Sequence, residues 1–468
     1  MKKSKLLIIS LLIINCQLSI INCSAQYTTI LNFAGIPNGA SPYGSLISDG
    51  TFLYGITSLG GTSNAGTIFK IKPDGTAYSK LSDIPSYTEG DLFNDGTFMY
   101  GLLPNGGSQG EGTIFKIKTD GTGYSIIYDF STPGSGGHKP EGSLISDGTF
   151  LYGMTSLNNG NIFKINKDGT GYSVLHNFGS SNGPDGSNPW GSLVFDGTFL
   201  YGMTTTGGAY ICSNGGCGTI FKIKPDGTAY SILYNFDNGR NPTNGYLISI
   251  GNFLFGMTNS GGSSQQGTIF KIKNDGTSFA KLLDFTGLMG NGGLPSGSLT
   301  YDGTYLYGMG TSGGSLGCNV GCGSIVQVKP DGTGYAKLYD FSGIGDGSSP
   351  YGSLFFNGNS LYGMTLLGGT NSHGTIFKFH SAGMGITENN SETDFKIYPN
   401  PSNGTFTIDT KENDYKLFIT DILGAIVYQS EIKNVKSEID LSKQPNGIYF
   451  INIKTEKGTS VQKLIIQK

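Results

Sequence analysis

The amino-acid sequence predicts an all-β protein, a seven-bladed β-propeller of four-stranded blades followed by a small β-sandwich. One phrase recurs seven times at a spacing of roughly 51 residues, which is typical of propeller repeats. Glycine is abundant, at 77 of 468 residues, and charged residues make up only 13%. The 26 tyrosines and 28 phenylalanines still provide a large apolar core, which argues against the collagen-like and disordered classes.

Residues 1–25 have the features of a secretory signal peptide. A short basic start is followed by a long apolar stretch and by small residues up to Ala25. We therefore expect cleavage between Ala25 and Gln26 and export from the cytoplasm. Acylation of Cys16 or Cys23, as in a lipoprotein, is the alternative. No later segment is long and apolar enough for a transmembrane helix, so none is expected in the mature chain.

A single repeat contains the signals of two β-hairpins. In the first copy, an apolar run at 44–48 and a β-branched and aromatic run at 51–57 flank Asp49-Gly50. Asp-Gly suits a type I′ turn, because both central residues of that turn need positive φ. The runs at 66–72 and 76–84 predict the second hairpin. Each repeat is therefore expected to form a four-stranded antiparallel sheet.

The predicted ring closes through the N-terminal strand. The seventh repeat ends after the run at 374–379 without a fourth strand, whereas residues 27–33 match the fourth-strand phrase at 230–236. A strand from the N-terminus would complete the seventh blade and leave no exposed terminal repeat, which places the propeller at residues 26–384. An open stack of the same repeats is the alternative.

Charge and cysteine content narrow the classes of partner. The net charge is −3 and the only arginine is Arg240, so no basic surface for nucleic acid is expected. Cys212 with Cys217, and Cys318 with Cys322, fall in equivalent loops of the fourth and sixth repeats. Short spacing in an exported chain predicts two local disulfides, and a shared four-cysteine zinc site is the alternative.

One face of the propeller is the candidate binding face. Its loops vary in length and composition, whereas the other face carries short Asp-Gly turns, and variable loops on a rigid scaffold usually bind ligands. Trp190, Tyr43 and Tyr351 share one repeat position, so their rings are expected to form an aromatic surface near the central channel. Arg240 would engage an acidic group. The alternative is that these rings only pack against neighbouring loops.

Acidic and amide side chains in the same loops suggest two further possibilities. Asn-Gly and Asp-Gly pairs, among them Asp185-Gly186, offer oxygen ligands for Ca²⁺, although turn formation also explains them. Paired carboxylates would suffice for glycoside chemistry, with solvated loop carboxylates as the alternative. The candidates are Glu89, Glu111, Glu141, Asp185 and Asp346. The four histidines show no metal-binding spacing, so no metal and no catalytic residue is assigned.

The repeat resembles the GloVer tandem repeat of bacterial surface proteins. The elements G-x-L, D-G-x-x-L-Y-G-M-T and G-T-I-F-K-I carry the resemblance over about residues 27–380. The family has no assigned activity to carry over. It implies a surface protein in which the repeats are joined to a separate C-terminal anchor.

The C-terminal region resembles a type A sorting domain of the type IX secretion system. Polar residues at 385–394 predict a linker, and short alternating runs at 395–468 predict the β-sandwich. The resemblance rests on Pro399, Asn400, Pro401, Gly404, Gly447 and Tyr449. It implies a Bacteroidota-type bacterium, the type IX machinery as partner, and passage through the periplasm and outer membrane to release or attachment at the surface.

Together these features predict a secreted or surface-displayed binding or adhesion platform, with glycans as the candidate ligand. Trp190, Arg240, Tyr43, Tyr351 and Asp185 are the candidate ligand-binding residues. A carbohydrate-active enzyme and a purely structural surface protein are the competing functions. No organic cofactor is expected, and Ca²⁺ stays an open possibility.

Overall fold

The computed structural model contains β-strands and no α-helix in the part of the chain that it describes. That part is residues 26–131, 137–212, 215–237, 242, 245–287, 290–314, 318, 321–380, 395–421, 426–455 and 458–467. The predicted signal peptide at 1–25 and the linker at 385–394 lie outside these residues. Within them, no helix is long and apolar enough to cross a membrane.

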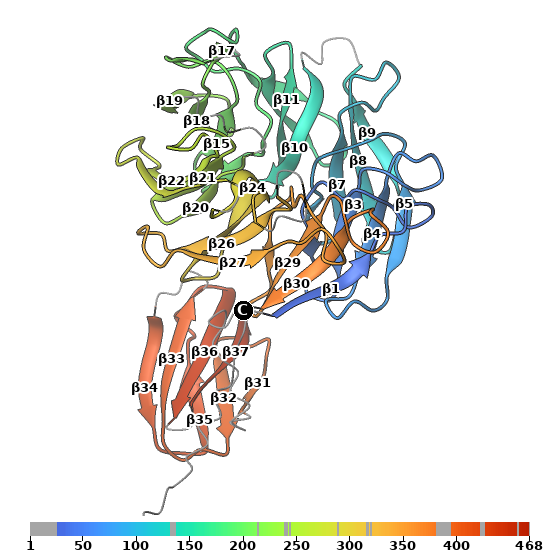
Figure 1. Cartoon of the computed structure of the whole chain (residues 1–468). Coiled ribbons are helices and arrows are strands. Elements are labelled where there is room, and N and C mark those ends of the chain that lie inside the picture. The colour runs from blue at the N-terminus through green and yellow to red at the C-terminus, as the bar shows by residue number, and fades with distance from the viewer. Residues whose placement is uncertain are drawn as a thin grey trace, which may run out of the picture.

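Seven four-stranded antiparallel sheets follow one another around a common axis between Gln26 and His380 (Figure 1). From the inner to the outer strand, the first three sheets are β2 (Ile47–Ser48), β3 (Leu53–Thr57), β4 (Thr67–Ile71), β5 (Ser79–Asp83); β6 (Phe93–Asn94), β7 (Phe98–Leu103), β8 (Thr113–Lys118), β9 (Ser125–Asp129); and β10 (His138–Ser146), β11 (Phe150–Leu157), β12 (Asn161–Asn166), β13 (Ser173–Asn177). The other four are β14 (Val194–Phe195), β15 (Leu200–Thr204), β18 (Thr219–Ile223), β19 (Ser231–Asn235); β20 (Ile248–Ile250), β21 (Phe253–Thr258), β22 (Thr268–Lys273), β23 (Ala280–Asp284); β24 (Gly293–Tyr301), β25 (Leu306–Ser312), β26 (Ser324–Val328), β27 (Ala336–Asp340); and β28 (Phe355–Phe356), β29 (Leu361–Thr365), β30 (Thr375–His380), β1 (Gln26–Asn32).

The middle strands of each sheet are buried on both faces because every sheet packs between two others. All five residues of β3 are buried. Its sequence does not alternate between apolar and polar residues, as is typical of a strand that is covered on both faces. Tyr54 and Ile56 of β3 share one buried cluster with Phe115 and Ile117 of the next sheet. The core of the propeller is therefore a series of apolar layers between adjacent sheets.

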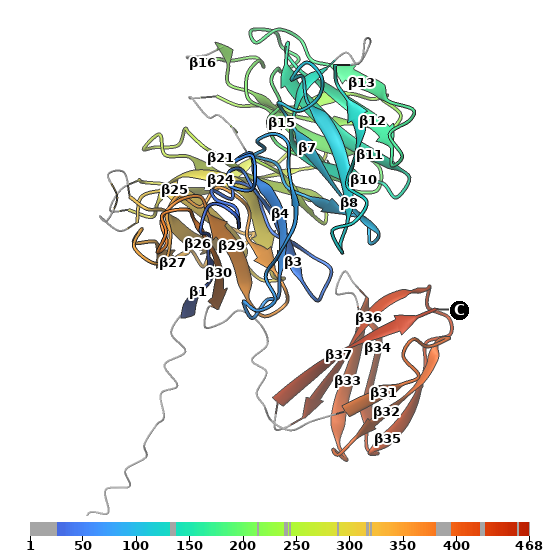
Figure 2. The ribbon, with the colours of Figure 1, turned by 90° about the vertical axis from the view of Figure 1, so that its right-hand side faces the viewer.

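The N-terminal strand closes the ring as predicted. β1 pairs antiparallel with β30, with Gln26 opposite His380 (Figure 2). Tyr27 of β1 also stacks on Tyr339 of the preceding sheet, with ring centroids 4.3 Å apart, and its hydroxyl donates to the Asp346 carbonyl at 2.6 Å. The first described residues thus tie the last sheet to its neighbour.

The Asp-Gly turns differ from the predicted geometry. Gly50 has a φ of +91°, but Asp49 is not among the residues with positive φ, and the Asp49 amide donates to the Phe52 carbonyl at 3.3 Å. Gly50 and Thr51 are therefore the central pair, which fits a type II′ rather than a type I′ turn. The Asp49 carboxylate instead accepts from the amides of Thr51 and Phe52 at 2.8 Å and from the Tyr54 hydroxyl at 2.7 Å.

A ring of seven glycines surrounds the axis, within the inner strands β10 and β24 and just before the other inner strands. The seven are Gly44, Gly90, Gly142, Gly191, Gly245, Gly297 and Gly352. A Cβ on Gly191 would lie 2.2 Å from the Gly245 carbonyl oxygen, and one on Gly352 would lie 2.2 Å from that of Gly44. Gly245 and Gly297 are joined by a β-bridge. Glycine is thus required here because neighbouring backbones approach too closely for any side chain.

The C-terminal module is a two-sheet β-sandwich. One sheet contains β31 (Phe395–Tyr398), β32 (Thr405–Thr410) and β35 (Lys436–Asp440). The other contains β34 (Ile426–Ile432), β33 (Tyr415–Asp421), β36 (Gly447–Thr455) and β37 (Gly458–Ile466). Phe406 and Ile408 of one sheet pack with Leu417, Ile419 and Ile451 of the other in a single core. A remaining short hairpin, β16 (Ile211–Cys212) with β17 (Gly215–Gly216), lies in a propeller loop.

Candidate functional site

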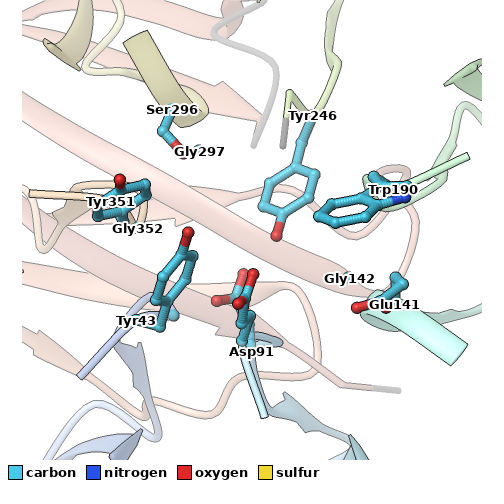
Figure 3. Close-up of a pocket in the computed structure, with 12 residues that line it drawn as sticks. Tyr43, Asp91, Glu141, Gly142, Trp190, Tyr246, Ser296, Gly297, Tyr351 and Gly352 are labelled. Carbon is cyan, nitrogen blue, oxygen red and sulfur yellow. The ribbon is translucent and has the colours of Figure 1, made fainter. Parts of the chain in front are cut away.

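A pocket on the propeller axis is lined by residues that stand next to the ring glycines in the sequence. Tyr43, Glu89, Glu141, Trp190, Ser296 and Tyr351 each directly precede a ring glycine, and all six line this pocket. The seventh residue of the set, Asn244, lies outside the described residues. Figure 3 shows the labelled side chains converging from different sheets on one space. The cavity volume of the pocket is about 20 Å³, which is room for a small end group of a ligand rather than for a whole sugar ring.

The residues that follow the ring glycines tie neighbouring sheets together. Five of the seven are serine, and backbone amides donate to the serine hydroxyl of the next sheet. The Ser143 amide donates to Ser192 Oγ at 2.6 Å, and the Ser353 amide donates to Ser45 Oγ at 2.8 Å. These bonds, together with the glycine contacts, fix the wall of the pocket rigidly.

Asp91 and Tyr246 replace serine at two of these positions, and both line the pocket. The Asp91 carboxylate accepts from the Ser45 amide, as a serine hydroxyl does elsewhere in the ring, and thereby brings a carboxylate to the axis. Burial raises the pKa of Asp91 above its usual range, against the opposing effect of its hydrogen bonds to Ser45 and Ser143. Burial also raises the pKa of Tyr246, and the nearby Asp91 carboxylate adds to the effect.

Glu89 and Glu141 bring two further carboxyl groups to the same pocket. Burial raises the pKa of Glu141 to about 8, with a further contribution from the Glu89 charge and a smaller opposing one from Lys139. Tyr87 donates a hydrogen bond from its hydroxyl to Glu89 Oε1. Glu141 is therefore mostly protonated at pH 7, and it can donate as well as accept a hydrogen bond.

Aromatic rings form much of the remaining wall. Tyr43 and Tyr351 stack on each other with centroids 4.4 Å apart and an interplanar angle of 30°. Trp190 is 38% exposed, and it lies close to Tyr246 in Figure 3. The pocket thus combines apolar ring faces with carboxyl groups, a combination that suits a small ligand with both apolar and polar faces.

Ser296 adds a buried hydroxyl group to the wall. The residue is only 3% exposed, yet it lines the pocket. Within the described part of the chain its hydroxyl has no hydrogen-bond partner. Because Ser296 lines the pocket, this hydroxyl is available to a ligand or a water molecule there.

The structure brings together only some of the residues predicted from the sequence. Trp190, Tyr43 and Tyr351 line one pocket. Asp185 does not, because its carboxylate lies 3.0 Å from His176 Nε2 on β13, an outer strand. Arg240 lies outside the described residues.

The five candidate carboxylates do not meet as one group. Glu89 and Glu141 share the axial pocket, whereas Glu111 lies 3.1 Å from His138 Nδ1. Asp346 accepts from the Ser342 amide at 2.9 Å and from the Ser342 hydroxyl at 2.7 Å, within its own loop.

The sequence analysis missed Asp91, Tyr246 and Ser296. An alignment of the seven repeats contains the signal for the first two, because they replace serine in the phrase G-S-L.

Two of the candidate calcium ligands, Asn291 of the Asn291-Gly292 pair and Asp346 of the Asp346-Gly347 pair, bond within their own loops, whereas Asp185 bonds to His176. Asn291 Oδ1 accepts from the Thr286 amide at 2.6 Å, and Asp346 bonds to Ser342 as described above. Among the residues with described positions, no group of three or more His, Cys, Asp or Glu side chains is arranged to hold a metal ion. The axial pocket therefore offers carboxyl, hydroxyl and aromatic groups rather than a formed metal site.

Both predicted disulfides are present. Cys212 bonds to Cys217 and Cys318 bonds to Cys322, so the four sulfur atoms brace two loops instead of sharing a zinc ion. Such bonds persist in oxidising compartments outside the cytoplasm.

The sorting-motif residues hold the C-terminal sandwich together. The Ile465 amide donates to Asn400 Oδ1 at 2.9 Å, which ties the loop that contains Pro399 and Pro401 to β37. Gly404 has a φ of +111°, and a Cβ there would lie 2.7 Å from Ser442 Cα. Gly447 begins β36, and the Tyr449 hydroxyl donates to the Pro445 carbonyl at 2.8 Å.

Solved structures share the fold at low sequence identity. The oligogalacturonate lyase in complex with manganese matches with a TM-score of 0.50 at 11% identity, over 76% of this chain and 96% of that one. PorZ, a surface component of the type IX secretion system of Porphyromonas gingivalis, matches with a TM-score of 0.47 at 15% identity, over 94% of this chain and 61% of PorZ. The extracellular domain of the putative one-component system BT4673 of B. thetaiotaomicron gives 0.48 at 12%, over 95% and 58%. The chain thus spans about three fifths of the last two, and no curated protein matches it.

Two protein families match the sequence itself. Residues 396–467 match the secretion system C-terminal sorting domain. This domain directs the protein through type IX secretion to the cell surface or the extracellular space, and the two disulfides fit that location. The Gloeobacter/Verrucomicrobia repeat matches at 18–158, 87–320 and 211–396, which together cover most of the chain. The chain belongs to the Gloeobacter/Verrucomicrobia repeat family and is a secreted surface propeller with a type IX sorting domain.

Proposed function

We propose that the protein binds a glycan end in the axial pocket, and that the propeller presents this pocket outside the cell. The observation that carries the proposal is the pairing of ring faces with carboxyl groups in one pocket. A sugar ring has C–H faces that pack on aromatic rings and hydroxyl groups that need hydrogen-bond partners. Trp190, Tyr43 and Tyr351 supply the first kind of contact, and Glu89 and Asp91 supply acceptors for the second.

The rigidity of the wall supports a binding role. The glycine ring and the amide-to-hydroxyl bonds hold the pocket residues on seven different sheets in fixed positions. A preformed site loses little conformational entropy when the ligand binds.

Glycoside hydrolysis is the second candidate function. Glu141, with a raised pKa, and Glu89 beside it form the kind of carboxyl pair in which one group is an acid and the other a base. An enzyme of this kind would release products, whereas a binding protein would retain the glycan unchanged.

A polysaccharide screen on purified residues 26–468 tests the proposal. It scores retention of the glycan and release of products. Each is measured with and without Ca²⁺, because the loop oxygens are candidate calcium ligands. We expect retention without turnover, which Trp190→Ala weakens. Tyr335→Ala is the matched control, because Tyr335 has a similar exposure of 40% and does not line the pocket. Product release would favour the enzyme, and no retention in any condition would favour a purely structural protein.

A further inference from the structure

We propose that the axial pocket selects glycan ends that carry a free, protonated amino group, such as a hexosamine residue without an N-acetyl group. The inference rests on the proposed function and names its ligand class. It follows from the charge balance of the pocket, from the aromatic wall and from the unpartnered hydroxyl of Ser296.

The pocket is lined by three acidic residues. Glu89, Asp91 and Glu141 all line it, and no lysine, arginine or histidine does so among the residues with described positions. The Lys139 charge lowers the pKa of Glu141, but its Nζ donates to Asn105 Oδ1 at 3.0 Å at an exposed site. A ligand ammonium group would bring a positive charge to the carboxyl groups of the pocket.

The two glutamates repel each other when the pocket is empty. The Glu89 charge contributes to the raised pKa of Glu141, so the free protein keeps a proton on Glu141 near pH 7. The groups that influence this site are Glu89, Lys139, the Ser156 hydroxyl and, through Tyr246, Asp91. A bound ammonium group would favour the charged form of Glu141, and the displaced proton would go to solvent.

The wall suits a small ammonium group at the end of a sugar. The faces of Trp, Tyr and Phe rings attract cations, and Tyr43, Trp190, Tyr246 and Tyr351 all line the pocket. An ammonium group has three N–H donors and no acceptor, so it needs several acceptors within a small space. The carboxylates provide some of these, and the buried Ser296 hydroxyl, which has no partner among the described residues, provides another.

Calorimetric titration of residues 26–468 with matched glucosamine and N-acetylglucosamine oligomers tests the inference. We expect the free-amine oligomer to bind at least tenfold more tightly at pH 6.5. Glu141→Gln and Ser296→Ala should each reduce that preference at least threefold, while the exposed Glu438→Gln in the sorting domain should leave it unchanged. Glu141→Gln keeps the shape of the side chain, so a folded variant is expected.

A second arm isolates the titration of the pocket. An oligomer with quaternary trimethylammonium groups keeps its charge at every pH. Its affinity should rise between pH 6 and pH 9 as Glu141 becomes easier to ionise, and this rise should disappear in Glu141→Gln. A flat pH profile in the unmodified protein would overturn the role assigned to Glu141.

The outcomes separate this inference from the proposed function. Equal affinity for both oligomers, or tighter binding of an N-acetylated or uronic acid oligomer, overturns the inference and leaves glycan binding in place. Binding of tetramethylammonium as tightly as the oligomer supports the cation preference but overturns the glycan assignment. Failure of every glycan, here and in the polysaccharide screen, overturns both.

Discussion

Replacement of Glu141 by glutamine should stabilise the propeller at alkaline pH and leave it nearly unchanged at acidic pH. The pKa of Glu141 rises from 4.5 to about 8 on folding, so the folded chain binds more protons than the unfolded chain between these values. The contribution of Glu141 to stability is therefore fully present below about pH 4.5, and it is lost as the pH rises to about 8. A shift of this size corresponds to at most about 5 kcal/mol, at about 1.4 kcal/mol per pKa unit.

Urea unfolding at pH 4.5 and pH 9 measures this effect. Trp190 is the only tryptophan, so its fluorescence reports on the propeller and not on the sorting domain. The free energy of unfolding of Glu141→Gln should match that of the unmodified protein at pH 4.5 and exceed it by about 2 to 5 kcal/mol at pH 9. A constant difference between the two pH values would refute the assignment of a buried carboxyl group with a raised pKa at the axis.

Three further predictions concern the ring and the sorting domain. Gly191→Ala should destabilise the propeller by at least about 2 kcal/mol in the same assay, because its Cβ would lie 2.2 Å from a neighbouring carbonyl oxygen, whereas Gly179→Ala, whose Cβ would lie 3.3 Å from its nearest neighbour, should cost less. Tyr27→Ala should cost about 3 kcal/mol through loss of the stack on Tyr339, and Tyr27→Phe about 1 kcal/mol through loss of one hydrogen bond; equal losses would contradict the stacking role. Deletion of residues 395–468 should leave the propeller inside the cell envelope, as cell fractionation would reveal, while continued secretion would contradict the role of the sorting domain.

The fold was predictable because the same turn and strand signals recur in each repeat. The missing fourth strand after 374–379 and its match at 27–33 were enough to predict the pairing of β1 with β30. The turn type was not predictable from Asp-Gly alone. Asp49 uses its carboxylate to cap the turn, and this choice depends on the amides and the Tyr54 hydroxyl around it.

The site was predictable only where a residue type stood out within the repeat. Trp190 and Tyr351 are aromatic residues at one repeat position, and both line the axial pocket. Asp185 lies in a similar loop but contacts His176 on the outer strand β13, so it is farther from the axis. The sequence does not reveal which strand a loop residue contacts. Ser296 occupies the same repeat position as Trp190 and Tyr351, but a serine there does not stand out, and only its burial and lack of a partner in the structure draw it into the site.

Fluorescence titration tests most directly whether the ligand occupies the axial pocket. The single tryptophan, Trp190, lies in the pocket wall, so any ligand that enters should change its emission. With the glycan retained in the polysaccharide screen, the account predicts a saturable change whose midpoint equals the calorimetric dissociation constant. A glycan that binds by calorimetry without changing the emission of Trp190 would place the binding site elsewhere and contradict the account.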